Sequence, residues 1–165
     1  MSNYFEDLVI GTVTDLGAHT FTAEAIKSFA RTYDPQPFHI DEELAKASLM
    51  GGLCASGWHT AAEFTGISMR HRQQIEAAIT ARGETIAVWG PSPGFKDLRW
   101  PKPVFAGDRV SFRRTVAAKI DLKSRPERGL LQTLGEGHNQ RGELVFQVTG
   151  QILVPRRRTH QSPVA

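Results

Sequence analysis

The chain has 165 residues, of which 40% are hydrophobic and 22% are charged. This length fits one domain with an adequate core, and the composition is that of an ordinary globular protein. The 20 basic residues exceed the 17 acidic residues by 3, a difference that Arg156, Arg157 and Arg158 alone supply. The pI of about 9.3 therefore reflects the C-terminal tail. It is weak support for nucleic-acid binding, and we expect no nucleic-acid partner.

The sequence shows no sign of a membrane or secretory protein. It contains no run of 18 apolar residues, so no transmembrane helix is predicted. The first residues are acidic and lack the basic and apolar regions of a signal peptide. Cys54 is the single cysteine, which rules out an internal disulfide. We therefore expect a cytoplasmic protein without a membrane partner.

The first part of the chain predicts one strand followed by short helices. The strand is expected at residues 12–20. Apolar residues at helical spacing then predict a helix at 23–32, with Thr22 as its N-cap. Two prolines follow in the segment Asp34-Pro-Gln-Pro, and they predict an extended loop, because a residue before proline is pushed out of the helical region. Asp41 is expected to cap a second short helix.

The longest helix is predicted to begin at Ser56 or Gly57 and to run to about residue 81. Its apolar residues recur at helical spacing, so they form one face that we expect to pack on a sheet. Met69 and Ile75 belong to this face. Arg72 is expected to face water.

The second half of the chain predicts strands. Residues 85–89 are a candidate buried strand, and one short strand is expected before Pro101 and Pro103. Alternation of apolar and polar residues predicts three long strands, at residues 110–122, 129–140 and 144–154. One strand, helices and then four strands indicate an α+β fold, with the long helix on one antiparallel sheet. Since the helix covers only one face of the sheet, we expect a dimer.

Asp34 and His39 are the candidate catalytic pair. Pro35 and Pro37 stiffen the loop between them, so a carboxylate and an imidazole can share one small volume. Together they could hold a water molecule and deprotonate it, as a general base does. A structural role is equally open at this stage. An aspartate before proline often caps a turn, and a histidine can be a buried, hydrogen-bonded core residue.

The start of the long helix is the second candidate element. If the helix begins at Gly57, its backbone N–H points toward the loop along the helix dipole, where it would stabilise an anion such as a thioester enolate. Ser56 would serve as N-cap, a role compatible with a place in the site. Cys54 lies between apolar residues and is expected to be buried rather than nucleophilic.

No metal site is expected. Asp34, His39, Asp41 and His59 lie near one another in sequence, but their spacing matches no common zinc motif. Phosphate-loop and dinucleotide-binding motifs are also missing from the sequence.

These residues resemble a known family. The segment Asp34-Pro-Gln-Pro-Phe-His39-Ile-Asp41, followed by Ala55-Ser56-Gly57, looks like the hydratase motif of the MaoC-like (R)-specific enoyl-CoA hydratases. Similar segments span roughly residues 20–154. The resemblance implies a hotdog fold for residues 1–154, in which a sheet wraps around the long helix. It also implies a homodimer or dimer of dimers; residues 155–165 are left as a basic, flexible tail.

The resemblance also implies a reaction. This is hydration of a trans-2-enoyl-CoA to an (R)-3-hydroxyacyl-CoA, or the reverse, with an acyl-CoA as partner and no metal or organic cofactor. Asp34 and His39 match the family's catalytic pair, and the Gly57 amide matches its oxyanion hole, with Ser56 beside it. The chain departs from the family pattern at three positions. Gln36 stands where an asparagine is common, Phe38 stands where a leucine is common, and Ser56 stands where a histidine often precedes the glycine.

Two other hypotheses are open on the same fold. An acyl-CoA thioesterase would use an acid on the long helix, where Glu63 is available. A non-catalytic acyl-CoA-binding protein would bind its ligand without turnover. Release of free CoA thiol separates the thioesterase from the hydratase.

Overall fold

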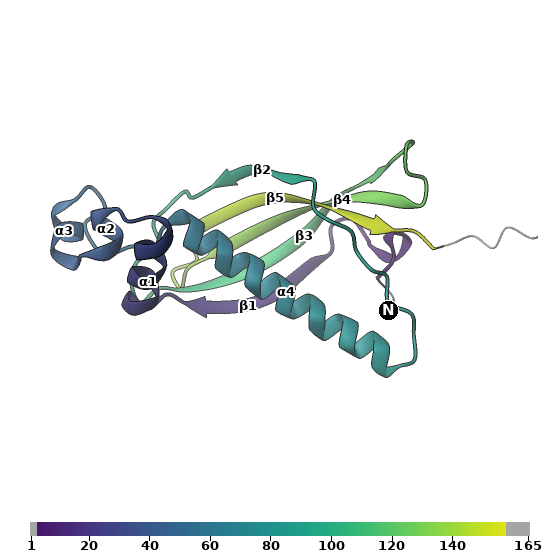
Figure 1. The fold of residues 1–165 in the computed structure, drawn as a ribbon, viewed down its shortest axis with the longest axis horizontal. Helices are drawn as coiled ribbons and strands as arrows, with labels where there is room; N and C mark the ends of the chain where they lie inside the picture. The colour runs from purple at the N-terminus through teal and green to yellow at the C-terminus, as the bar shows by residue number, and fades with distance from the viewer. Residues whose placement is uncertain (1–2, 158–165) are drawn as a thin grey trace, which may run out of the picture.

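The computed structural model describes residues 3–157 and shows an antiparallel sheet with one long helix along one of its faces (Figure 1). The sheet has the order β1-β3-β4-β5-β2, so β1 and β2 form its two edges. This arrangement confirms the predicted α+β fold. The strands are β1 (Val13–Thr20), β2 (Gly94–Arg99), β3 (Arg109–Asp121), β4 (Arg128–His138) and β5 (Leu144–Pro155).

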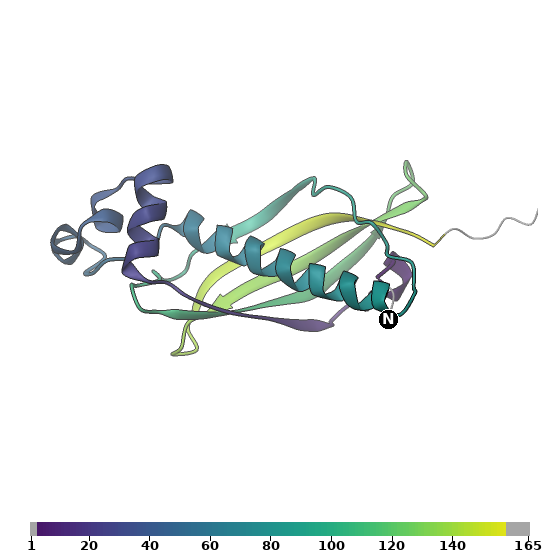
Figure 2. The same cartoon turned by 60° about the horizontal axis from the view of Figure 1, so that its bottom comes forward.

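The helices begin where the capping residues predict. Thr22, Asp41 and Ser56 each accept a backbone N–H from the first turn of the helix that follows. Three short helices gather at the end of the molecule where the long helix begins (Figure 1, Figure 2). None of the described helices is long and apolar enough to cross a membrane. The helices are η1 (Phe5–Asp7), α1 (Ala23–Tyr33), α2 (Pro37–Ile40), α3 (Glu42–Ala47) and α4 (Gly57–Ala81).

The extended loop predicted after Asp34 is wrong in one respect, because α2 forms a single helical turn within it. Pro37 occupies the first position of this turn, where a fixed φ suits a helix and a missing N–H costs nothing. Fully extended chain would separate residues 34 and 39 by roughly 17 Å. The turn instead folds His39 back toward Asp34, so it is the device that assembles the pair.

The buried strand predicted at residues 85–89 is also wrong. Only Ala87 of this segment is fully buried, and its backbone pairs with a side chain instead of a strand. The Asn3 amide accepts the Ala87 N–H at 2.9 Å and donates to the Ala87 carbonyl at 3.3 Å. One side-chain amide therefore satisfies both backbone groups, and a neighbouring strand is not needed.

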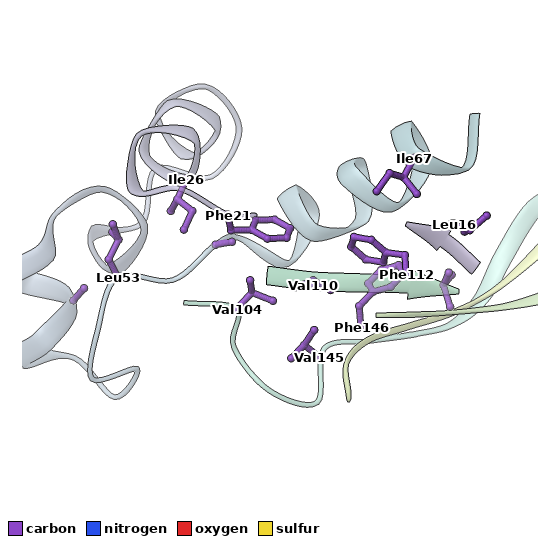
Figure 3. Packing of buried hydrophobic residues seen from close by; sticks show 13 residues of the cluster. Leu16, Phe21, Ile26, Leu53, Ile67, Val104, Val110, Phe112, Val145 and Phe146 are labelled. Carbon is purple, nitrogen blue, oxygen red and sulfur yellow. The ribbon is translucent and has the colours of Figure 1, made fainter. Parts of the chain in front are cut away.

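The core lies between α4 and the sheet. Phe112 of β3 and Phe146 of β5 are fully buried beneath the helix (Figure 3). Phe64 of α4 packs on the Phe146 ring, with 5.1 Å between the ring centroids. Gly135 of β4 makes this approach possible, because a Cβ atom at that position would overlap the Phe64 ring. A glycine in the sheet thus lets the helix pack closely, at the cost of some strand propensity.

The predicted polar and apolar faces of α4 are only partly correct. Ile67 and Ile79 are buried, but Met69 is 45% exposed and Ile75 is 38% exposed. Arg72, expected in water, is half-buried and lies over the Trp89 ring at 5.4 Å. The helix therefore presents apolar side chains to its surroundings and one cation to the interior.

The first residues of the predicted tail contact the body of the protein. Pro155 still belongs to β5. Arg156 pairs with Asp121 and lies over the Phe5 ring at 4.5 Å, while Arg157 binds the Asp7 carboxylate at 2.7 Å. Arg158 and the rest of the predicted tail lie outside the described residues.

The close approach of α4 to the sheet predicts that Gly135→Ala destabilises the protein. The added methyl group must displace the Phe64 ring, and such overpacking costs about 1–3 kcal/mol of unfolding free energy. Gly150→Ala is the matched control in β5, because its Cβ would lie 3.4 Å from Thr133 Oγ1, an ordinary contact. Urea unfolding of both variants tests this. Equal stabilities would contradict the prediction.

Candidate active site

The Asp34 and His39 side chains meet at the end of the molecule where α4 begins. His39 is buried, and its Nδ1 lies 2.6 Å from the Cys54 carbonyl oxygen. A carbonyl only accepts, so Nδ1 carries the proton and donates it. This hydrogen bond sets the tautomer and turns Nε2 toward Asp34, whose Oδ2 lies 3.4 Å away.

Two neighbouring side chains hold the Asp34 carboxylate. Ser56 Oγ donates to Asp34 Oδ2 at 2.6 Å, and Gln36 Nε2 donates to Asp34 Oδ1 at 2.9 Å. Burial alone would raise the pKa of Asp34, but these two hydrogen bonds and the nearby His39 outweigh it and lower the pKa below its usual value. Asp34 is therefore an anion at neutral pH.

The pair is suited to binding and activating water. A neutral His39 presents the lone pair of Nε2, and an ionised Asp34 presents a carboxylate oxygen, so the two facing groups are both acceptors. Acceptors do not bond each other, but a water molecule can donate one hydrogen to each. Such a water would be oriented and polarised at the point where either group can take its proton. The structure thus brings together the two residues that the sequence singled out.

Gly57 lies beside the pair as the first residue of α4. Helix geometry leaves its N–H without an intrahelical acceptor, and the dipole of this long helix adds positive potential there. A Cβ at residue 57 would lie 2.6 Å from the Trp100 indole. The position therefore requires glycine for space.

All four predicted site residues line one cavity of about 350 Å³: Asp34, His39, Ser56 and Gly57. The remaining wall is largely apolar. It includes Phe38, Met50, Ala55, Trp58, Trp100, Pro101, Pro103, Val104 and Val145. A carboxylate, an imidazole and the first residue of α4 thus line one largely apolar space.

Comparison with known proteins identifies the family. The model of the MaoC-like domain matches residues 8–133, more than half of the chain. The chain belongs to the MaoC-like domain family. A MaoC-like dehydratase from Rhodospirillum rubrum is 37% identical, with a TM-score of 0.75, over 96% of this chain and all of that one.

Two further proteins extend the comparison. The (R)-hydratase PhaJ1 of Pseudomonas aeruginosa shares 18% identity and a TM-score of 0.64, over 98% of this chain and 95% of that one, which shows the common hotdog fold. The uncharacterised protein YdeM of Bacillus subtilis (strain 168) is 27% identical over 152 residues, 92% of this chain and 98% of its own. The predicted family and the hotdog fold are therefore confirmed.

Several residues of this MaoC-like site give no signal in the sequence. Trp100 stands over Gly57, and its ring meets that of Trp58 edge-on at 5.4 Å. Lys102 lines the same cavity and pairs with Glu143 at 2.6 Å. Both follow the short strand β2 in a proline-rich stretch without periodicity, so only tertiary structure brings them to the helix start.

Other acidic and histidine residues near the motif lie elsewhere. The Asp41 carboxylate caps α3. His59 stacks on Phe29 at 4.6 Å, away from the Asp34 cavity, and burial lowers its pKa. Its polar neighbours are His19 and Glu63, which lie 3.3 Å apart (Nδ1 to Oε2). Glu63 is not among the described residues that line the Asp34 cavity. It is also not among those that line a second, larger cavity between α4 and the sheet.

Cys54 is buried, as predicted, and burial raises the pKa of its thiol. A protonated thiol is a poor nucleophile at neutral pH. Its contribution to the MaoC-like site is the backbone carbonyl that orients His39.

The double role of Ser56 predicts a pH-dependent effect of Ser56→Ala. Loss of the cap costs about 1 kcal/mol of unfolding free energy at any pH. The lowered pKa of Asp34 adds stability above its unfolded pKa of about 4, and this is lost as the pH falls through the lower folded value. The variant weakens the shift, so its destabilisation is larger at neutral pH than in acid.

Urea unfolding at neutral pH and at a pH below the pKa of Asp34 measures the difference in stability. Thr22→Ala is the matched control, because Thr22 caps α1 through the Ala25 N–H. Its cost is expected to be independent of pH. A Ser56→Ala cost that is equally flat would show that the hydroxyl does not stabilise the Asp34 anion.

Proposed function

We propose that this MaoC-like protein hydrates a trans-2-enoyl-CoA to an (R)-3-hydroxyacyl-CoA and catalyses the reverse dehydration. The observation that carries the proposal is the facing of His39 Nε2 and Asp34 Oδ2, 3.4 Å apart, on a cavity that also receives the first N–H of α4. Membership of the MaoC-like family supports it, as does the 37% identity to a protein described as a MaoC-like dehydratase.

Asp34 and His39 together, and the Gly57 N–H, each have one role in the proposed reaction. Asp34 and His39 hold a water molecule, and one of them takes its proton as the oxygen bonds to the β-carbon. The electron pair of the double bond moves toward the thioester, and negative charge collects on the thioester oxygen. The Gly57 N–H and the helix dipole stabilise this charge. Transfer of the proton to the α-carbon completes the addition of H and OH.

The scheme requires no metal or organic cofactor. The CoA thioester itself makes the α-carbon acidic, and the oxyanion is bound by a backbone N–H. The acyl-CoA is therefore the substrate and the small-molecule partner.

Removal of either member of the pair is expected to abolish turnover. Asp34→Asn keeps the shape of the side chain but removes the charge, and His39→Ala removes the imidazole. Loss of a positioned general acid–base group costs about 10²–10⁴-fold in rate. The decrease of enoyl absorbance with crotonyl-CoA or a longer homologue measures it. Near-normal rates in both variants would sink the mechanism.

Glu63→Gln is the matched control for the rival thioesterase. Glu63 is the acid that a thioesterase on this fold would use, but it pairs with His19 outside the cavity. We expect the variant to hydrate enoyl-CoA at close to the wild-type rate. A thiol reagent in the same assay reports hydrolysis, and release of free CoA that depends on Glu63 would favour the thioesterase.

We further propose that the protein is a homodimer or a dimer of such dimers. The outer edge of β2 has no neighbouring strand in the described chain, and Phe95 of β2 is 58% exposed. Met69 and Ile75 of α4 are exposed as well. A second copy placed here would cover both the strand edge and the apolar side chains.

Sedimentation velocity tests the assembly. The wild type is expected to sediment as a dimer or larger at micromolar concentration. Phe95→Asp is expected to shift it toward the monomer, because the new charge would be buried in the interface. A wild type that is cleanly monomeric at working concentration would contradict the proposal.

A further inference from the structure

A second cavity, of about 500 Å³, lies between α4 and the sheet. Trp58 lines both cavities, so the second cavity is a neighbour of the one that contains Asp34 and His39. It continues along the helix from Trp58 to Arg72, about 21 Å at the rise of an α-helix. Most of the wall is apolar, with Phe146 on the sheet side. Met69 and Phe95 also line it, so the proposed dimer would close the cavity around a methylene chain that extends from the site.

Arg114 is a charged residue in this largely apolar wall. Val110 and Phe112 precede it on the face of β3 that turns toward α4, and both are fully buried. Arg114 itself is half-buried and lines the cavity. No ion pair or side-chain hydrogen bond joins Arg114 to another described residue. A cation in an apolar wall is costly unless an anion pairs with it.

The nearest charges do not supply this anion. Arg72 lies close to Arg114 and adds a second positive charge, which together with burial lowers the pKa of Arg114. Glu76 is already engaged, since its carboxylate accepts from Arg72 Nε at 2.8 Å. Only Arg72 is paired with this carboxylate, so the two guanidinium groups leave a net positive charge at the cavity.

Ser68 adds an independent observation. It lies one turn before Arg72 on α4, it lines the same cavity, and its buried hydroxyl has no hydrogen-bond partner among the described residues. Buried polar groups in folded proteins are nearly always paired. A ligand with an oxygen atom beside Ser68 would supply the partner that this hydroxyl lacks.

We propose that this cavity binds the acyl chain, and that Arg114 recognises a carboxylate at the chain's far end. The preferred substrates are then trans-2-enoyl-CoA thioesters of dicarboxylic acids. This inference rests on the proposed hydratase function. A guanidinium presents two parallel N–H donors that match a carboxylate, so it selects for that group more sharply than a lysine would.

Paired substrates test the proposal. A series of trans-2-enoyl-CoAs of increasing length is assayed with and without a terminal carboxylate, and crotonyl-CoA serves as the short reference. At the length that reaches Arg114, the wild type is expected to prefer the carboxylated member roughly 10- to 100-fold in kcat/KM, the range for charged hydrogen bonds. Arg114→Met is expected to lose this preference, measured as the ratio of kcat/KM for the carboxylated and the alkyl member of each pair.

Two further variants test whether the substrate preference depends on the charge at residue 114. Arg113→Met is the matched control, because Arg113 lies on the opposite face of β3 and pairs with Glu136 at 2.9 Å. Its substrate preference is expected to equal that of the wild type. Arg114→Lys keeps the charge and is expected to retain part of the preference, even if the methionine variant folds poorly.

The other outcomes overturn different statements. A wild type that turns over alkyl and carboxylated substrates equally at every length overturns the role of Arg114 but leaves the hydratase intact. The same holds if Arg114→Met lowers both activities alike, as it would if a partner subunit's acid neutralised Arg114. A wild type that consumes no enoyl-CoA, crotonyl-CoA included, overturns the hydratase and this inference together.

Discussion

The Ser56 hydroxyl accepts a hydrogen bond from the Trp58 N–H at the start of α4 and donates one to the Asp34 carboxylate at 2.6 Å. A single oxygen atom thus fixes where the long helix begins and where the acid lies. Because Gly57 follows directly, its free N–H is held at a set position relative to Asp34. The helix cap therefore sets the distance between the Asp34 carboxylate and the Gly57 N–H. In the proposed mechanism these groups are the general base and the oxyanion site, and precise placement of such groups is a large part of catalytic power.

Gln36 and Ser56, two of the departures from the family pattern, have the same role in the structure. Both side chains donate to Asp34, one to each carboxylate oxygen. Together they oppose the effect of burial and lower the pKa of Asp34. The Gln36 amide and the Ser56 hydroxyl therefore keep Asp34 ionised, and both are uncharged donors. A histidine in place of Ser56 would add a titratable group beside the acid, so this chain keeps the charge of Asp34 less dependent on pH.

Local signals predicted the helix starts and the long strands, because caps and alternation are properties of neighbouring residues. The pair Asp34 and His39 was also accessible, since one motif carries both. What failed depended on distant partners. Ala87 lies outside any strand because Asn3 satisfies its backbone, 84 residues away in sequence. Trp100 and Arg114 reach their cavities only through the path of the sheet, which no local pattern encodes.

The packing of α4 on the sheet is uneven, and this unevenness leaves the second cavity open. Over β4, the absence of a side chain at Gly135 lets Phe64 close the gap. Over β5 and β2, Val148, Gly150 and Leu98 leave the helix and sheet apart, and the second cavity opens there. A helix is nearly rigid, so close contact along one side fixes the width of the gap along the other. Gly135 under one edge of α4 therefore sets the width of the cavity under the opposite edge, where the proposed acyl chain would lie.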